Sequence, residues 1–174
     1  GLALFALVVL SLASLVAIQY RDELQHAHER HELLARVLED HTTRTLDSAA
    51  MGMAAVAGMI VAGEPASSAG VLRAMQQTLV NQMQLRSLSL MDAKGRVLAA
   101  AGEQPSGDVN LDALAPLPEQ SQPLLGRVRW GRGLPMRTGE APVPAGLVTL
   151  PFVQRVAAPG GSALYLVGLL NPDY

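Results

Sequence analysis

Hydrophobic residues are spaced differently in successive regions of this chain. The first region, residues 1–20, contains no charged side chain. A helix rises about 1.5 Å per residue, so a helix of this length would cross the ~30 Å hydrocarbon core of a bilayer. We therefore expect one transmembrane helix over residues 1–20. The alternative is a signal peptide with Ser11 and Ala13 at its cleavage site.

A long helix is predicted over residues 21–62, directly after this segment. No proline interrupts it, and its apolar or small residues recur at spacings of three and four, which places them in one stripe. The stripe consists of Leu34, Leu38, Thr42, Thr45, Leu46, Ala49, Met53, Val56 and Ile60. The first half is rich in Arg, Asp and Glu, which predicts a solvated signalling stalk that forms a homodimer through the long helix.

The uncharged residues 48–63 have two interpretations. They could form a second membrane helix, which would place the rest of the chain in the cytoplasm. Sixteen residues rise only about 24 Å, however, which is short for a bilayer core. A helix that is apolar all round is typical of a buried element. We therefore expect this helix end to be buried against a sheet.

The remaining chain alternates between strand and turn patterns. A second helix over residues 67–83 precedes a hairpin of strands 85–91 and 96–100, with Gly95 suited to the turn. Residues 102–123 read as a loop with a helical turn near 110–114, and further strands are expected over 124–130, 145–156 and 162–170. The last is nearly all apolar and should be central. The fold class expected is α+β, a five-stranded antiparallel sheet packed by the long helix.

This order of elements resembles Cache domains, the PAS-like extracytoplasmic sensor domains of bacterial transmembrane receptors. The resemblance is carried by the membrane segment that runs into a long helix, by the hairpin 88–98 with Asp92 and Gly95, by the strand 151–155 that ends in Arg155, and by the ending 164–174. It is closest to the membrane-distal half of a double-Cache region. Residues 63–174 would then form the sensor domain, continued by a second half in a longer protein.

The resemblance implies a function as well as a fold. Such domains lie in the periplasm, are anchored in the inner membrane and bind a small ligand in the concave face of the sheet. They signal to a cytoplasmic output such as a diguanylate cyclase or a histidine kinase, which this chain lacks. The pattern that marks amino-acid-binding members is not recognisable here, so the ligand class stays open. The alternative function is a membrane-anchored scaffold that binds no small molecule.

The amino-acid composition excludes several kinds of partner and of catalytic or metal site. The formal net charge of −2 argues against a nucleic-acid partner, and the absence of cysteine removes disulfides, thiolate metal sites and cysteine nucleophiles. No nucleophile elbow, P-loop or zinc-protease motif occurs, so we expect this chain to be no enzyme and to hold no cofactor. His28, His31 and Glu32 have a spacing that can hold a metal, but with His26 and His41 they fit a solvated helix face better, and no metal site is predicted.

The candidate ligand-binding residues are Arg127, Arg129, Trp130, Arg155 and Tyr165. The first two belong to a hairpin with Arg132 and Arg137 that contains no acid, which suggests an anionic ligand, lipid headgroups or simply a solvated face. Trp130 is interpreted as either a pocket wall or a core residue. Arg155 and Tyr165 fall on neighbouring strands, and Arg155 needs a ligand carboxylate, an internal acid or solvent as its partner.

Overall fold

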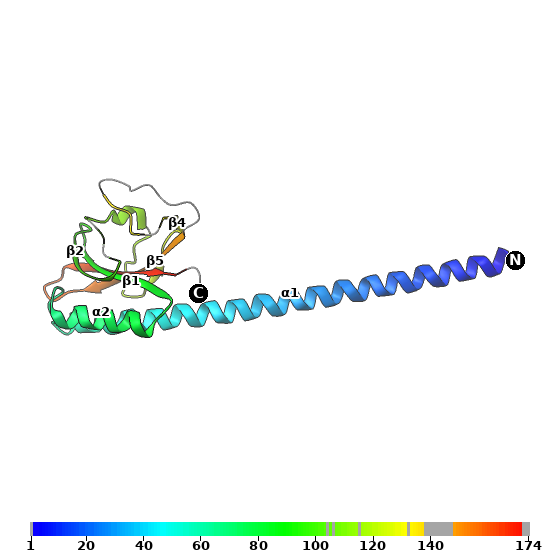
Figure 1. Cartoon of the computed structure of the whole chain (residues 1–174), viewed down its shortest axis with the longest axis horizontal. Coiled ribbons are helices and arrows are strands. Elements are labelled where there is room, and N and C mark those ends of the chain that lie inside the picture. The colour runs from blue at the N-terminus through cyan, green and yellow to red at the C-terminus, as the bar shows by residue number, and fades with distance from the viewer. Residues whose placement is uncertain are drawn as a thin grey trace. The chain divides into compact units, whose positions relative to one another are not determined.

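The computed structural model describes residues 2–103, 105, 107–114, 116–131, 133–137 and 148–171, with side chains from His31 onward. Two helices, a 3₁₀ helix and six strands follow one another along these residues (Figure 1). They are α1 (Leu2–Val61), α2 (Ala69–Asn81), β1 (Leu85–Asp92), β2 (Val97–Gly102), η1 (Leu111–Leu114), β3 (Leu124–Leu125), β4 (Arg129–Trp130), β5 (Val148–Ala157) and β6 (Ala163–Leu170). The fold class is α+β, as predicted. The chain divides into two units, Gly1–Arg44 and Thr45–Tyr174.

The first unit is the N-terminal part of α1. The predicted transmembrane segment 1–20 lies outside the residues whose side chains are described. Within the described part of the chain, no helix has both the length and the apolar character needed to cross a membrane. Leu33, Leu34, Val37 and Leu38 are 57–66% exposed. Charged neighbours pair one turn apart on the same helix, including Arg44 with Asp40 at 3.0 Å between Nη2 and Oδ2.

The second unit is built on an antiparallel sheet with the strand order β2-β1-β6-β5-β3, and β4 also pairs with β5. Strand β6 is central, as its apolar sequence predicted. The prediction of five strands is wrong by one, because the expected strand 124–130 is two short strands. Gly126 N donates to Pro151 O at 2.8 Å, but Pro151 has no N–H to donate in return, so the ladder is interrupted there.

One face of this sheet is covered by α2 and by the C-terminal part of α1 (Figure 1). The buried residues of this layer come from both helices and four strands: Ala49, Met53, Val56, Ala57, Ile60, Val71, Met75, Leu85, Leu88, Leu90, Ala101, Phe152, Val156, Leu164, Leu166 and Leu170. Residues 48–63 therefore pack against the sheet as predicted, but with one face only, since Met51 and Val61 are 68% and 59% exposed. Gly52 lets the two helices approach closely, since a Cβ there would lie 2.8 Å from Thr78 Cγ2.

Local hydrogen bonds fix the start of α2 and the turn between β1 and β2. Ser68 caps α2, because its Oγ accepts the Val71 amide at 3.1 Å. In the β1–β2 turn, Asp92 Oδ1 accepts the amides of Lys94 and Arg96 at 2.9 and 3.0 Å. Gly95 has a φ of 81°, a conformation that favours glycine, which agrees with its predicted place in this turn.

The other face of the sheet is covered by η1 and by irregular segments between residues 107 and 137. A second cluster packs there, made of Met91, Val109, Leu111, Leu114, Leu134, Val153, Val167 and Leu169. The helical turn expected near 110–114 is confirmed as η1. Two parts of this cover are joined to each other, because Val109 and Met136 form a bridge and Arg137 N donates to Asp108 O at 2.8 Å.

Candidate functional site

The candidate site lies on the loop-covered face of the sheet, where polar side chains are buried among the apolar cluster. Ser87 pairs with Leu169 and Ser89 pairs with Val167, and directly paired residues of an antiparallel sheet share a face. Both serines are therefore on the side of the second cluster. Ser89 is 0% exposed, and its Oγ has no hydrogen-bond partner among the described residues. A buried hydroxyl without a partner costs roughly 1–3 kcal/mol, so its retention needs a reason.

Arg86 stands at one end of this polar group. The β1–β6 register shifts between Leu85 and Ser87, and such a bulge re-aims the side chain that it carries. The guanidinium Nη2 donates to Thr149 Oγ1 on β5 at 3.3 Å, and Nε lies 3.4 Å from Glu103 Oε2, just after β2. The Arg86 side chain is 17% exposed and that of Glu103 is 38% exposed. The ion pair is thus sheltered on its cationic side and open on its anionic side.

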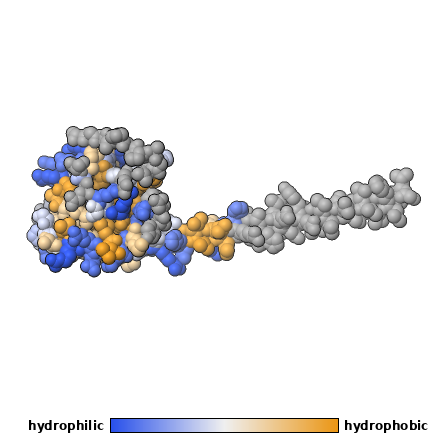
Figure 2. All heavy atoms as spheres, viewed as in Figure 1, coloured by the Kyte–Doolittle hydropathy of each residue, from blue (hydrophilic) through white to orange (hydrophobic). Residues whose placement is uncertain are grey.

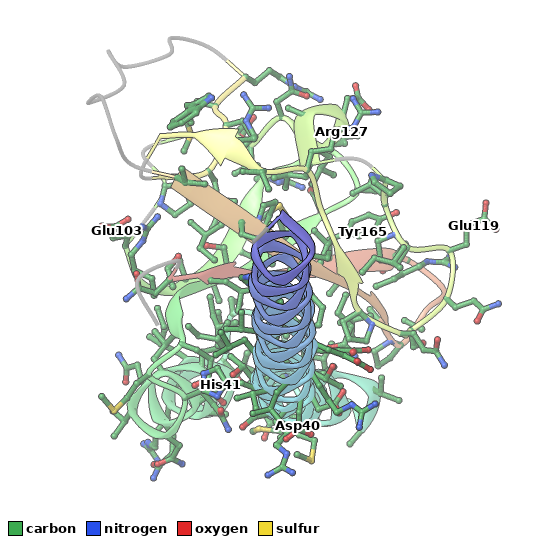
Figure 3. The ribbon with its side chains drawn as sticks, turned by 90° about the vertical axis from the view of Figure 1, so that its right-hand side faces the viewer. Asp40, His41, Glu103, Glu119, Arg127 and Tyr165 are labelled. Atoms are coloured by element: carbon green, nitrogen blue, oxygen red, sulfur yellow. The ribbon has the colours of Figure 1, made fainter. Side chains whose placement is uncertain are left out.

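Thr149 ties this group to the cover of the sheet. It is buried, and its hydroxyl donates to the carbonyl oxygen of Gly131, which follows β4. Arg86, Thr149 and Gly131 therefore form one chain of polar contacts from β1 across β5 to the segment after β4. Figure 3 shows Glu103 on the opposite side of the domain from Tyr165 and Glu119.

Two of the three candidates around β4, Arg127 and Trp130, are exposed, and Arg129 is half-buried. Arg127 lies before β4 and is exposed, and Arg129 Nη1 donates to Ala113 O at 3.2 Å. Trp130 is 73% exposed, so its interpretation as a core residue is wrong. Its neighbour on β5, Val148, directly follows the undescribed residues 138–147. Arg132 also lies outside the described residues.

The other two candidates are brought together as predicted. Arg155 and Tyr165 lie directly opposite each other on β5 and β6. Arg155 Nη1 donates to Glu119 O at 2.5 Å, so its partner in the structure is a backbone carbonyl. Tyr165 is half-buried against the second cluster.

The five candidates therefore form two groups. Arg129 pairs with Thr149, whereas Tyr165 pairs with Arg155, six residues farther along β5. At about 3.3 Å per residue the groups are ~20 Å apart, too far to share one small ligand.

The sequence analysis missed Arg86, Glu103 and Thr149. Ser87 and Ser89 alternate with leucines, which is typical of a strand with one wet face, but the loops bury that face here. Arg86 looks like an ordinary surface charge in the sequence, because its partner on β5 is 63 residues away. The sequence feature that could have indicated this site is the pair of alternating serines, Ser87 and Ser89, directly after Arg86.

The histidines of α1 do not form a metal site in the described part of the chain. His31 and His41 are exposed, and the side chains of His26 and His28 lie outside the description. No group of three or more His, Asp or Glu side chains gathers among the described residues.

A scan against protein-family models gives no match for this chain, and a search of the curated proteins finds none that is similar to it.

Proposed function

We propose that this chain is the ligand-sensing region of a membrane-bound signal-transduction receptor of the Cache kind. In this proposal residues 1–20 anchor it in a bacterial inner membrane, and the sheet lies in the periplasm. Its ligand is small, and a diguanylate cyclase or histidine kinase elsewhere in the full-length protein gives the output. The chain itself catalyses nothing. The observation that carries the proposal is the contrast between the two faces of the sheet.

One face is closed by helices and the other holds buried polar groups under irregular segments. Ligand sites are mostly apolar, with a few polar groups that fix orientation. The second cluster supplies the apolar part, and Arg86, Ser89 and Thr149 supply the polar part. Outside η1, β3 and β4, the described residues between 107 and 137 form no regular helix or strand, so they can move for a ligand at less cost than a helix can.

Helix α1 provides the means of transmission. It contributes Ala49, Met53, Val56, Ala57 and Ile60 to the core beneath the same sheet. A ligand that favours one packing of sheet on helix shifts the population toward that packing. A tenfold difference in affinity between two packings is worth ~1.4 kcal/mol, which changes their ratio tenfold.

The homodimer is part of the same proposal. Leu33, Leu34, Val37 and Leu38 lie on two adjacent turns of α1 and are exposed, and Figure 2 shows a hydrophobic patch on this helix. A second copy of the helix would bury them. Because the chain has no cysteine, a single Leu34→Cys substitution reports pairing without background. We expect it to form a disulfide across two copies in the membrane, whereas Glu39→Cys should form less of it.

A ligand screen tests the proposal. The full chain is reconstituted in lipid nanodiscs and its thermal unfolding is followed with small carboxylates, amino acids, amines and phosphates. A ligand at a hundredfold excess over its dissociation constant stabilises by ~2.7 kcal/mol, roughly 5–10 °C for a chain of this size. We expect at least one class to give such a shift. Unfolding at an unchanged temperature with every class would contradict ligand sensing.

A membrane-anchored scaffold is the second candidate, and one observation favours it. Leu124, Leu125, Val128 and Trp130 are exposed at the β3–β4 side of the sheet. Contiguous exposed apolar side chains mark protein-interaction surfaces. A scaffold predicts that Trp130→Ser abolishes capture of a partner protein and that no small molecule shifts the unfolding temperature. A sensor predicts a shift that survives Trp130→Ser.

A further inference from the structure

We propose that Arg86 binds the carboxylate of a small organic acid, in the place that the Glu103 carboxylate holds in the structure. Glu103 is thus an internal competitor of the ligand. This inference rests on the proposed sensing function and names the ligand class and the residue that anchors it.

The Arg86–Glu103 pair is close but poorly aligned. Nε and Oε2 are 3.4 Å apart, within the range of an ion pair, yet Nε is buried and makes no hydrogen bond among the described residues. A guanidinium has five N–H donors in a planar fork that fits a carboxylate with two parallel bonds. A free carboxylate can take that geometry, whereas Glu103 is held by its own backbone at the end of β2. A ligand carboxylate could therefore accept a hydrogen bond from Arg86 Nε, which Glu103 does not do in the structure.

The surface beside Arg86 is small on its β2 side and apolar on its β6 side. Ser87 is opposite Gly102 and Ser89 is opposite Ala100 on β2, whereas the same two serines are opposite Leu169 and Val167 on β6. Ser89 Oγ is fully buried and has no described partner. A short acid with a second hydrogen-bonding group, such as a hydroxyl or keto oxygen, would suit an arginine with a buried serine three residues farther along the strand.

The burial of the Arg86 guanidinium explains why Glu103 is paired with it. A sheltered guanidinium without a partner is strongly unfavourable, so Arg86 must be paired whether or not a ligand is present. Glu103 supplies that pair in the structure, and at 38% exposure its side chain borders the solvent into which a ligand would displace it. The exchange releases the residue that directly follows β2 (Val97–Gly102), so occupancy of Arg86 is linked to the end of an edge strand.

The test uses the full chain in lipid nanodiscs with acetate, lactate, pyruvate and succinate as probes and acetamide as an uncharged control. Binding is measured by calorimetry for the wild type, Glu103→Gln, Arg86→Lys and Arg127→Gln. We expect Glu103→Gln to bind at least one acid tenfold or more tightly than the wild type, because the competitor is gone. Arg86→Lys keeps the charge but not the fork and should lose most of the affinity. Arg127→Gln, which removes an exposed arginine, should bind as the wild type does.

Three results would overturn the inference. The first is a Glu103→Gln variant that binds no acid more tightly than the wild type, and the second is a Glu103→Gln variant that binds acetamide as well as acetate. The third is a folded Arg86→Lys variant with wild-type affinity. If the four acids fail but a neutral or cationic compound stabilises the chain in the broad screen, this inference falls and ligand sensing stands. If nothing binds in either experiment, both fall.

Discussion

Truncating Met53 tests the packing on which the proposed transmission depends. Met53 lies on α1 and is 0% exposed, and a Cβ added to Gly168 of β6 would lie 3.1 Å from its Sδ. Met51, two residues earlier on the same helix, is 68% exposed. The substitutions Met53→Ala and Met51→Ala therefore remove the same atoms from the same helix and differ only in burial.

The expected magnitude follows from the site. Replacing a buried methionine by alanine costs roughly 2–5 kcal/mol, depending on how far the surroundings collapse. Met53 packs against the centre of the sheet, where Gly168 is flanked by β1 and β5, so little collapse is expected and about 3 kcal/mol is a reasonable value. That lowers the unfolding temperature by roughly 6–12 °C. Met51→Ala should change the stability by less than ~0.5 kcal/mol.

Urea unfolding of the full chain, measured by pulse proteolysis at low protein concentration, gives both values. Equal losses from the two variants would refute the reasoning, since they would show that α1 does not present Met53 to the sheet. A larger loss from Met51→Ala would mean that the opposite helix face is the buried one. Either result would also remove the physical link between the sheet and the helix.

Three further predictions concern turns and caps. Gly95→Ala should destabilise the chain by at least ~1 kcal/mol more than Gly160→Ala in the same unfolding assay, because both glycines have positive φ but only at Gly95 would the Cβ meet a backbone atom, 1.9 Å from Val109 O. Ser68→Ala should lower the free energy of unfolding by ~1 kcal/mol because α2 loses its N-cap. Equal stability of the variant and the wild type would show that this cap does not stabilise the chain. Partial burial acts to raise the pKa of Asp92, but the backbone amides of Arg96 and Lys94 and then the Arg96 guanidinium outweigh it and lower that pKa below its usual value. The stability that Asp92 adds is therefore full above about pH 4 and is lost as the pH falls through the lowered pKa, so the gap between the wild type and Asp92→Asn should be constant near neutrality and close in acid.

The parts of the fold that sequence predicted are those set by local periodicity. The β1–β2 hairpin follows from alternation around a turn with Gly95, and the buried end of α1 follows from the absence of charge over residues 48–63. The strand 124–130 was predicted as continuous because its own residues favour a strand. It is split by Pro151, which belongs to a different strand and has no signal in the local pattern.

The candidate site could be predicted only in part for the same reason. Arg155 and Tyr165 are neighbours because a short turn joins β5 to β6 and fixes their register. The contact of Arg86 with Thr149 depends on a bulge and on β6 lying between their strands, neither of which can be read from spacing. The core interpretation of Trp130 was wrong because β4 is two residues long and lies at the margin of the sheet, whereas a lone tryptophan in a longer strand is usually buried.

Hydrogen exchange of the full chain with and without the strongest compound from the ligand screen tests the central claim most directly. The account expects slower exchange at backbone amides of β1 and β5 near Arg86 and Thr149, with a change in the same experiment over residues 45–61 of α1. Protection confined to the β3–β4 side of the sheet, or protection of the site without any change in α1, would contradict sensing through this helix.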